Sequence, residues 1–141
     1  MSVIDKLVEN QLGNLMYIDL SCQFEILSLP TDQACHEMCH ALNKQLGLSP
    51  DEAFKRRSEL FSFSRDEFDA WCNDVDVNKF AKTYPSRGDD LYILQEPSGD
   101  FIVFWQEREI RDDIKKFKTF QEAKIMAIEM RVKYLIGGYQ L

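Results

Sequence analysis

The stretch LYILQEPSGDFIVFWQ, residues 91–106, decides the fold of this chain. Its two ends, residues 91–94 and 101–105, are apolar, aromatic and β-branched, and the residues between them include the turn formers Pro97, Ser98 and Gly99. Two such runs around a proline and glycine turn are typical of a β-hairpin. The sequence therefore predicts an antiparallel hairpin in this region.

A long helix is predicted after the hairpin and a charged segment, residues 106–118. Thr119 and Glu122 form a capping box at its start, and Gly137 supplies a left-handed stop. One apolar stripe holds Phe120, Ala123, Met126, Ala127, Met130 and Tyr134, and a second holds Ile125, Ile128, Val132, Leu135 and Ile136. An apolar surface this wide needs cover on two sides. We expect the sheet on one side and other helices on the other; the alternative is that the second stripe forms a dimer or partner interface.

The first ninety residues predict mostly helices. Ser2 begins a short helix that ends at Gly13, and the alternation of apolar residues over 14–29 favours a pair of strands. Further helices are expected over 32–46, after Ser49, after Ser64 and over 76–82, and their core side chains are expected to be Phe54, Leu60, Phe61, Phe68, Trp71 and Cys72. The whole chain, 1–141, is predicted to be a single globular domain of the α+β class. In it, an N-terminal helix and strands precede several short helices, and the antiparallel hairpin packs on the long C-terminal helix.

The charge balance favours a protein partner over a nucleic acid. The chain has 24 acidic and 17 basic residues, a net charge of −7, whereas contacts to phosphate need a basic face. Acidic surfaces attract basic proteins, although a moderate negative charge also simply keeps a protein soluble. We find no signal peptide and no run long enough to cross a membrane, so we expect a cytoplasmic protein with four reduced cysteines.

The pattern His36-Glu37-x-x-His40 carries the most chemistry in the sequence, and it resembles the zincin metallopeptidases. Two imidazoles one helical turn apart can bind Zn²⁺ while Glu37 polarises the attacking water. Catalytic zinc also needs a third protein ligand, and nothing marks Glu59, Asp66, Glu67 or Asp69 for this role.

Helix geometry offers a second interpretation of the same segment, in which the histidines are half-exposed flanks of a buried stripe made of Cys35, Met38, Cys39, Leu42 and Leu46. We favour that interpretation, with no metal or cofactor, and keep zinc as the alternative. Cys35 and Cys39 grouped with the histidines are a weaker candidate, because structural zinc sites usually take ligands from two chain segments.

Two segments, FIVFWQER (101–108) and FKTFQEA (117–123), resemble the end of many small bacterial immunity proteins. Such proteins are cytosolic, acidic and non-catalytic, and they neutralise a cognate toxin, often a basic nuclease, by covering its active site. The resemblance implies a basic protein partner, with no direct contact to nucleic acid or membrane. The contact surface is then expected to combine exposed aromatics with these acids: Asp66, Glu67, Asp69, Asp74, Asp76, Asp89 and Asp90.

The chain also resembles the type III secretion chaperones, which are small and acidic, open with a helix and bind as homodimers. It departs from them over residues 32–82, where consecutive helices replace the expected strands. This resemblance is a second alternative, so both a monomer and a homodimer remain open.

Overall fold

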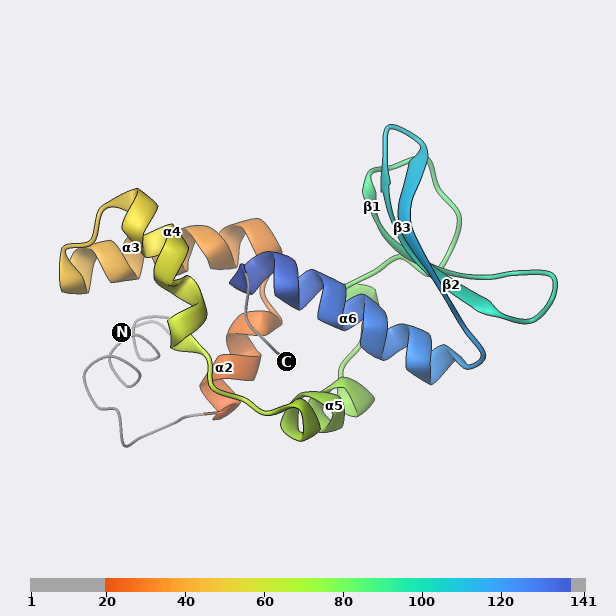
Figure 1. Ribbon diagram of the computed structural model, residues 1–141, viewed down its shortest axis with the longest axis horizontal. Coiled ribbons are helices and arrows are strands. Elements are labelled where there is room, and N and C mark those ends of the chain that lie inside the picture. The colour runs from red at the N-terminus through yellow and green to blue at the C-terminus, as the bar shows by residue number, and fades with distance from the viewer. Residues whose placement is uncertain (1–19, 138–141) are drawn as a thin grey trace. The chain divides into compact units, whose positions relative to one another are not determined.

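The computed structural model describes residues 20–137 and has the predicted α+β class. In chain order its elements are α2 (Leu20–Leu27), α3 (Thr31–Leu46), α4 (Pro50–Arg56), η2 (Arg57–Leu60), α5 (Arg65–Asp74), η3 (Val77–Lys79), β1 (Asp90–Gln95), β2 (Phe101–Glu107), β3 (Ile110–Phe117) and α6 (Phe120–Ile136) (Figure 1). The predicted helix over residues 2–12 and the start of the predicted strands lie outside the described residues. The described chain divides into two compact units, residues 20–67 with 132–137 and residues 68–131.

The prediction of strands is wrong where the structure describes it, because residues 20–27 form helix α2. The buried residues of α2 are Gln23, Ile26 and Leu27, which are spaced as one helix face requires. Gln23 is fully buried because its amide pairs with Ser62: Nε2 donates to the hydroxyl over 3.0 Å, and Oε1 accepts from the backbone N–H over 2.9 Å. A polar residue in an apolar position therefore concealed the helical pattern.

The predicted helix signals act as expected in α3, α4 and α5. Gly47 ends α3 in the left-handed conformation, at a φ of 66°. Ser49 caps α4 by accepting a hydrogen bond from the N–H of Glu52. The core prediction is confirmed for Leu60, Phe61, Phe68 and Cys72, but Phe54 is 51% exposed and Trp71 is half-buried.

The predicted hairpin is present as β1 and β2, which pair antiparallel from Asp90 opposite Gln106 to Gln95 opposite Phe101. Gly99 has a φ of 96° in the connecting turn, and its N–H donates to the carbonyl of Glu96 over 2.9 Å. This conformation is one that glycine adopts without steric cost.

The charged segment after the hairpin forms a third strand, β3, which we did not predict. β2 and β3 are joined by Arg108 and Glu109, whose φ angles are 52° and 67°. Two positive φ angles in a two-residue loop define a type I′ turn, which usually contains asparagine or glycine. The turn is held instead by the Asp89 carboxylate, which accepts a hydrogen bond from the N–H of Arg108 over 2.8 Å. The usual turn residues and an apolar alternation are both missing here, so the strand had no sequence signal.

Both edge strands of this three-stranded sheet, β1 and β3, depart from regular strand pairing. At β1, Lys82 forms a single parallel bridge with Tyr92. At β3, the register shifts between Val103 and Trp105, so Asp113 and Ile114 together face one residue of β2. Asp113 has a φ of 54° at this bulge. Within the described chain the sheet has the order β1-β2-β3.

The sheet packs on α6 through one face, as the sequence predicted. The shared core contains Leu91, Ile93 and Val103 from the strands and Ala123, Ala127 and Met130 from the helix. The helix leaves directly from the end of β3 (Figure 1), and the N–H of Glu122 donates to the hydroxyl of Thr119 over 3.2 Å at its start. The predicted cap therefore positions the apolar face of the helix.

The opposite face of the sheet is also covered, by the loop that precedes β1. Tyr92 and Phe104 stack there with ring centroids 5.4 Å apart, and both are buried. The hydroxyl of Tyr92 donates to the carbonyl of Gly88 over 2.6 Å, and Gln106 Nε2 donates to the carbonyls of Ser86 and Gly88. Two buried polar side chains therefore hold the loop against the strands.

The second apolar stripe of α6 is buried within the chain itself, at Ile128, Val132, Leu135 and Ile136. The alternative that this stripe forms an interface is therefore wrong for these four residues. Two residues of the first stripe are exposed instead, Phe120 at 38% and Tyr134 at 64%.

Arg57 is a buried cation at the C-terminal end of α6, with 5% of its surface exposed. Its Nε donates to the carbonyl of Leu135, its Nη1 donates to the carbonyl of Phe54, and its guanidinium lies 3.7 Å from the centre of the Phe54 ring. Carbonyl groups at a helix end lack partners within the helix, so Arg57 satisfies one of them from a distant part of the sequence.

Candidate functional site

The acids predicted to form a partner surface fall into two groups. One group, Asp66, Glu67, Asp69 and Asp74, lies on α5, and Asp76 follows it directly before η3. In the other group, Asp89 directly precedes β1 and Asp90 is the first residue of that strand. The two groups differ in how many of their carboxylates are already bonded within the chain.

On α5, the two end acids are available to a partner. Asp66 and Asp74 are exposed, and neither forms an ion pair or side-chain hydrogen bond with any residue in 20–137. Asp69 is half-buried. Glu67 completes the predicted capping box with Ser64, because its carboxylate accepts from the Ser64 N–H over 2.9 Å and its own N–H donates to the Ser64 hydroxyl. We therefore take Asp66 and Asp74 as the strongest candidates among the predicted acids.

The other predicted acids bond within the chain. Asp76 accepts a hydrogen bond from the N–H of Asn78 over 3.0 Å and so caps η3. Asp89 supports the turn at Arg108. Asp90 pairs with Arg131 Nη2 over 2.8 Å and accepts from the N–H of Leu91 over 2.7 Å. All three carboxylates therefore stabilise the fold of the chain itself.

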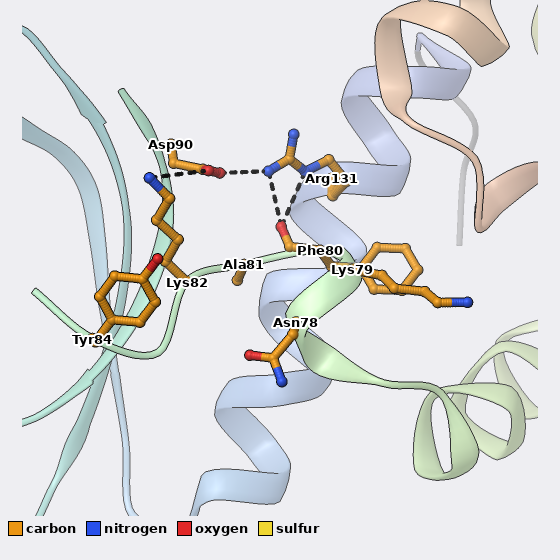
Figure 2. Close-up of a pocket in the computed structure, with 8 residues that line it drawn as sticks. All are labelled: Asn78, Lys79, Phe80, Ala81, Lys82, Tyr84, Asp90 and Arg131. Atoms are coloured by element: carbon orange, nitrogen blue, oxygen red, sulfur yellow. Dashed lines mark hydrogen bonds and ion pairs between the residues drawn. The ribbon is translucent and has the colours of Figure 1, made fainter. Parts of the chain in front are cut away.

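Asp90 and Arg131 also line a pocket of about 410 Å³. Its lining residues are Asn78, Lys79, Phe80, Ala81, Lys82, Tyr84, Asp90 and Arg131. Figure 2 shows Asp90 between Lys82 and Arg131, while Arg131 also reaches the carbonyl oxygen of Phe80, with Nη2 at 2.9 Å. Lys82 Nζ lies 3.9 Å from the Asp90 carboxylate, and Lys79 points away from this pair (Figure 2).

This pocket has three basic residues and one acid in its lining, so its charge does not suit a cationic partner. Its chief contacts join the segment before β1 to α6 and hold that part of the fold together. Sequence reasoning missed the pocket, because Lys82 and Arg131 are far apart in the chain and Arg131 belongs to neither apolar stripe of α6.

The pattern at residues 36–40 lies on α3, as predicted. His36 and His40 are exposed, and they are one helical turn apart, so they share a face. Glu37 is half-buried, and its carboxylate accepts a hydrogen bond from Gln33 Nε2 over 3.2 Å. The buried positions of the helix are Ala34, Met38, Ala41 and Leu42, while Leu46 is 45% exposed.

Within residues 20–137, no group of three or more His, Cys, Asp and Glu side chains lies close enough together to hold a metal ion. The described chain therefore offers two imidazoles but not the third ligand that catalytic zinc needs. The zinc peptidase hypothesis stays a prediction, and zinc analysis of the purified protein before and after His36→Ala is its direct test.

Cys35 and Cys39 lie on the same helix, and the structure makes them interacting neighbours. None of the chain's four cysteines forms a disulfide, and both thiols of this pair are half-buried. Burial raises the pKa of the Cys39 thiol, and the neighbouring Cys35 raises it further, whereas the Arg57 guanidinium lowers it. Sequence reasoning identified the two cysteines but not the arginine beside them.

Comparison with known proteins gives no family: no family model matches the chain, and neither the curated proteins nor the solved structures include a significant match. Among the described helices, none combines the length and the apolar character needed to cross a membrane.

Proposed function

We propose that this protein is a non-catalytic binding protein that neutralises a basic protein partner. In the finer form of the proposal it is a bacterial immunity protein that acts in the cytoplasm and covers the active site of a cognate nuclease-type toxin. The observation that carries the proposal is the pair of exposed carboxylates at the two ends of α5, Asp66 and Asp74.

The position of Asp74 supports a role beyond folding. It is the last residue of α5, and the last turn of this helix contains no basic residue. A negative charge at a helix C-terminus opposes the helix dipole and costs roughly 0.3–1 kcal/mol when exposed. Stability is commonly sacrificed at functional positions, where stability and activity trade off.

The charge of the whole chain supports the same proposal. A net charge of −7 accelerates encounter with a basic protein, because opposite charges steer the two molecules together. Of the two segments that carry the resemblance to immunity proteins, residues 101–108 form β2 and the start of the following turn, and residues 117–123 join the end of β3 to the capped start of α6.

The test is protection of cells that express a basic nuclease-type toxin encoded beside this gene. We expect co-expression of this protein to restore growth, and the purified pair to form a complex that weakens as salt rises, because salt screens exposed charges. The double variant Asp66→Asn, Asp74→Asn should bind more weakly, mainly through a slower association rate.

Glu25→Gln with Asp32→Asn is the matched control, since it removes the same charge from two other exposed acids. The control should lose only the small part of the association rate that depends on net charge, and should bind more tightly than the Asp66, Asp74 variant. If both double variants lost the same amount of affinity, the loss would be explained by net charge alone, and α5 would not be part of the interface. No complex and no protection with the neighbouring gene product would overturn the proposed function.

A further inference from the structure

Among the described residues, the pair of thiols on α3 are the most reactive side chains that the proposed function does not use. Cys35 and Cys39 are separated by one helical turn, so their Cβ atoms are about 5–6 Å apart on the same face. Both side chains are half-buried, and neither is in a disulfide. Two thiols at this separation can turn their sulfur atoms toward one another and hold one ion between them.

We propose that Cys35 and Cys39 form a two-sulfur site for Cu(I). Thiolates are soft ligands and select soft ions such as Cu(I). A structural zinc site would need four protein ligands, and residues 20–137 provide no group of three. Cu(I) is stable with two thiolates in a linear arrangement, so it is the ion that this incomplete set can satisfy.

Binding is a ligand exchange with no change of oxidation state. Each thiol loses its proton to solvent, each sulfur forms one bond to the metal, and copper stays Cu(I). The resulting complex has one net negative charge, from two thiolates and one monovalent cation. A site of this kind therefore benefits from a nearby fixed positive charge.

Arg57 supplies that charge. Its guanidinium is 5% exposed and is fixed by its bonds to the carbonyls of Leu135 and Phe54. Its charge lowers the pKa of the Cys39 thiol, against the larger effect of burial and the effect of Cys35, which both raise it. Charge interactions are screened less in a buried position than at the surface, so Arg57 offsets part of the cost of placing an anionic copper complex in this half-buried position.

The two histidines have a different place on α3. Each follows one of the cysteines directly in the sequence, so it is turned by about 100° around the helix axis. Both are exposed. The proposed site therefore depends on the cysteines and not on His36 or His40, and this distinguishes it from the zinc pattern.

The test is an anaerobic titration of the full chain with Cu(I), buffered by a chromophoric Cu(I) chelator such as bicinchoninate. We expect one Cu(I) per chain, and a fall in affinity of at least about tenfold in Cys35→Ser and in Cys39→Ser, the size seen when even outer groups of a metal site are lost. Cys22→Ser, another half-buried cysteine, and the double variant His36→Ala, His40→Ala should keep the affinity of the unmodified protein.

X-ray absorption of the unmodified chain loaded with Cu(I) identifies the atoms bound to copper. This measurement needs no variant, so it holds even if a variant fails to fold. Two sulfur neighbours would support the site, and so would loss of copper in the two serine variants with unchanged far-ultraviolet circular dichroism. Nitrogen neighbours, copper retained by both serine variants, or copper lost in the histidine variant would each overturn it. An Arg57→Met variant that binds Cu(I) as tightly as the unmodified chain would overturn the role of the arginine.

Discussion

The Nε of Arg57 donates a hydrogen bond to the carbonyl oxygen of Leu135 over 2.8 Å, across a sequence separation of 78 residues. The same guanidinium bonds the carbonyl of Phe54, so one side chain joins η2, α4 and the last turn of α6. The bond satisfies a helix-end carbonyl that has no partner within its own helix.

Arg57→Met should lower the free energy of unfolding by about 2–3 kcal/mol, because the apolar stem is kept while one buried and one part-buried hydrogen bond from a charged donor are lost. Urea unfolding followed by circular dichroism measures this change. A loss below about 0.5 kcal/mol, typical of surface substitutions, would show that the guanidinium contributes little to stability.

Gly137→Ala should destabilise the protein more than Gly99→Ala. Both glycines have positive φ angles, 71° and 96°, so alanine is strained at each. An added Cβ at Gly99 meets no atom within 4 Å, whereas at Gly137 it would overlap the Arg57 guanidinium. The difference between the two losses of unfolding free energy measures the cost of the overlap with Arg57. Equal losses for the two variants would contradict the close approach of Arg57 to Gly137.

Ile93→Ala should destabilise the chain by about 2–5 kcal/mol, the usual cost of removing a buried branched side chain. Ile93 is 2% exposed in the core that the sheet shares with α6. Ile114→Ala is the matched control, since Ile114 lies on β3 with 56% of its surface exposed. Thermal melting should separate the two variants clearly, and similar melting temperatures would contradict the assignment of the core face.

Asp74→Asn should stabilise the isolated protein by about 0.3–1 kcal/mol at low salt, because it removes a negative charge from the C-terminal end of α5. The gain should shrink as salt is added. A variant that is more stable and yet binds its partner more weakly would separate folding from function at this position. Destabilisation would mean that the carboxylate has a structural role.

The reactivity of Cys39 should depend on pH in a way that reflects its surroundings. Burial and then Cys35 raise the pKa of this thiol, so its alkylation by iodoacetamide should reach half its maximal rate above the ordinary cysteine value of about 8.5. Since folding favours the neutral thiol, the stabilisation is complete at neutral pH and declines as the pH rises past that value. Cys35→Ser should lower the midpoint, and Arg57→Met should raise it.

The sequence predicted the parts of the fold whose local signals agree with their tertiary surroundings. Ser49, Ser64 and Thr119 cap helices as expected, and Gly47 and Gly99 adopt the conformations that their positions required. The failures have a common cause, which is a side chain whose role depends on a distant partner. The buried Gln23 breaks the apolar pattern of α2, and its burial is possible because its amide hydrogen-bonds Ser62. The turn at Arg108 is likewise held by the distant carboxylate of Asp89.

For the candidate sites too, residues within one helix could be predicted and interactions with distant residues could not. The two cysteines of α3 could be grouped by their spacing along one helix, and the acids of α5 were named as the partner surface that the resemblance to immunity proteins implies. The ion pair between Asp90 and Arg131 and the electrostatic effect of Arg57 on Cys39 could not be predicted, because both join segments that are remote in the sequence.

The irregular edges of the sheet affect whether this protein aggregates at high concentration. A strand offered by another molecule would meet the single Lys82 bridge at one border and the bulge at Asp113 and Ile114 at the other. Bulges and charged residues at an exposed strand disfavour the backbone pairing that leads to fibres. The chain should therefore tolerate high expression without polymerising through its described strands, and its encounters with other proteins should be made by side chains.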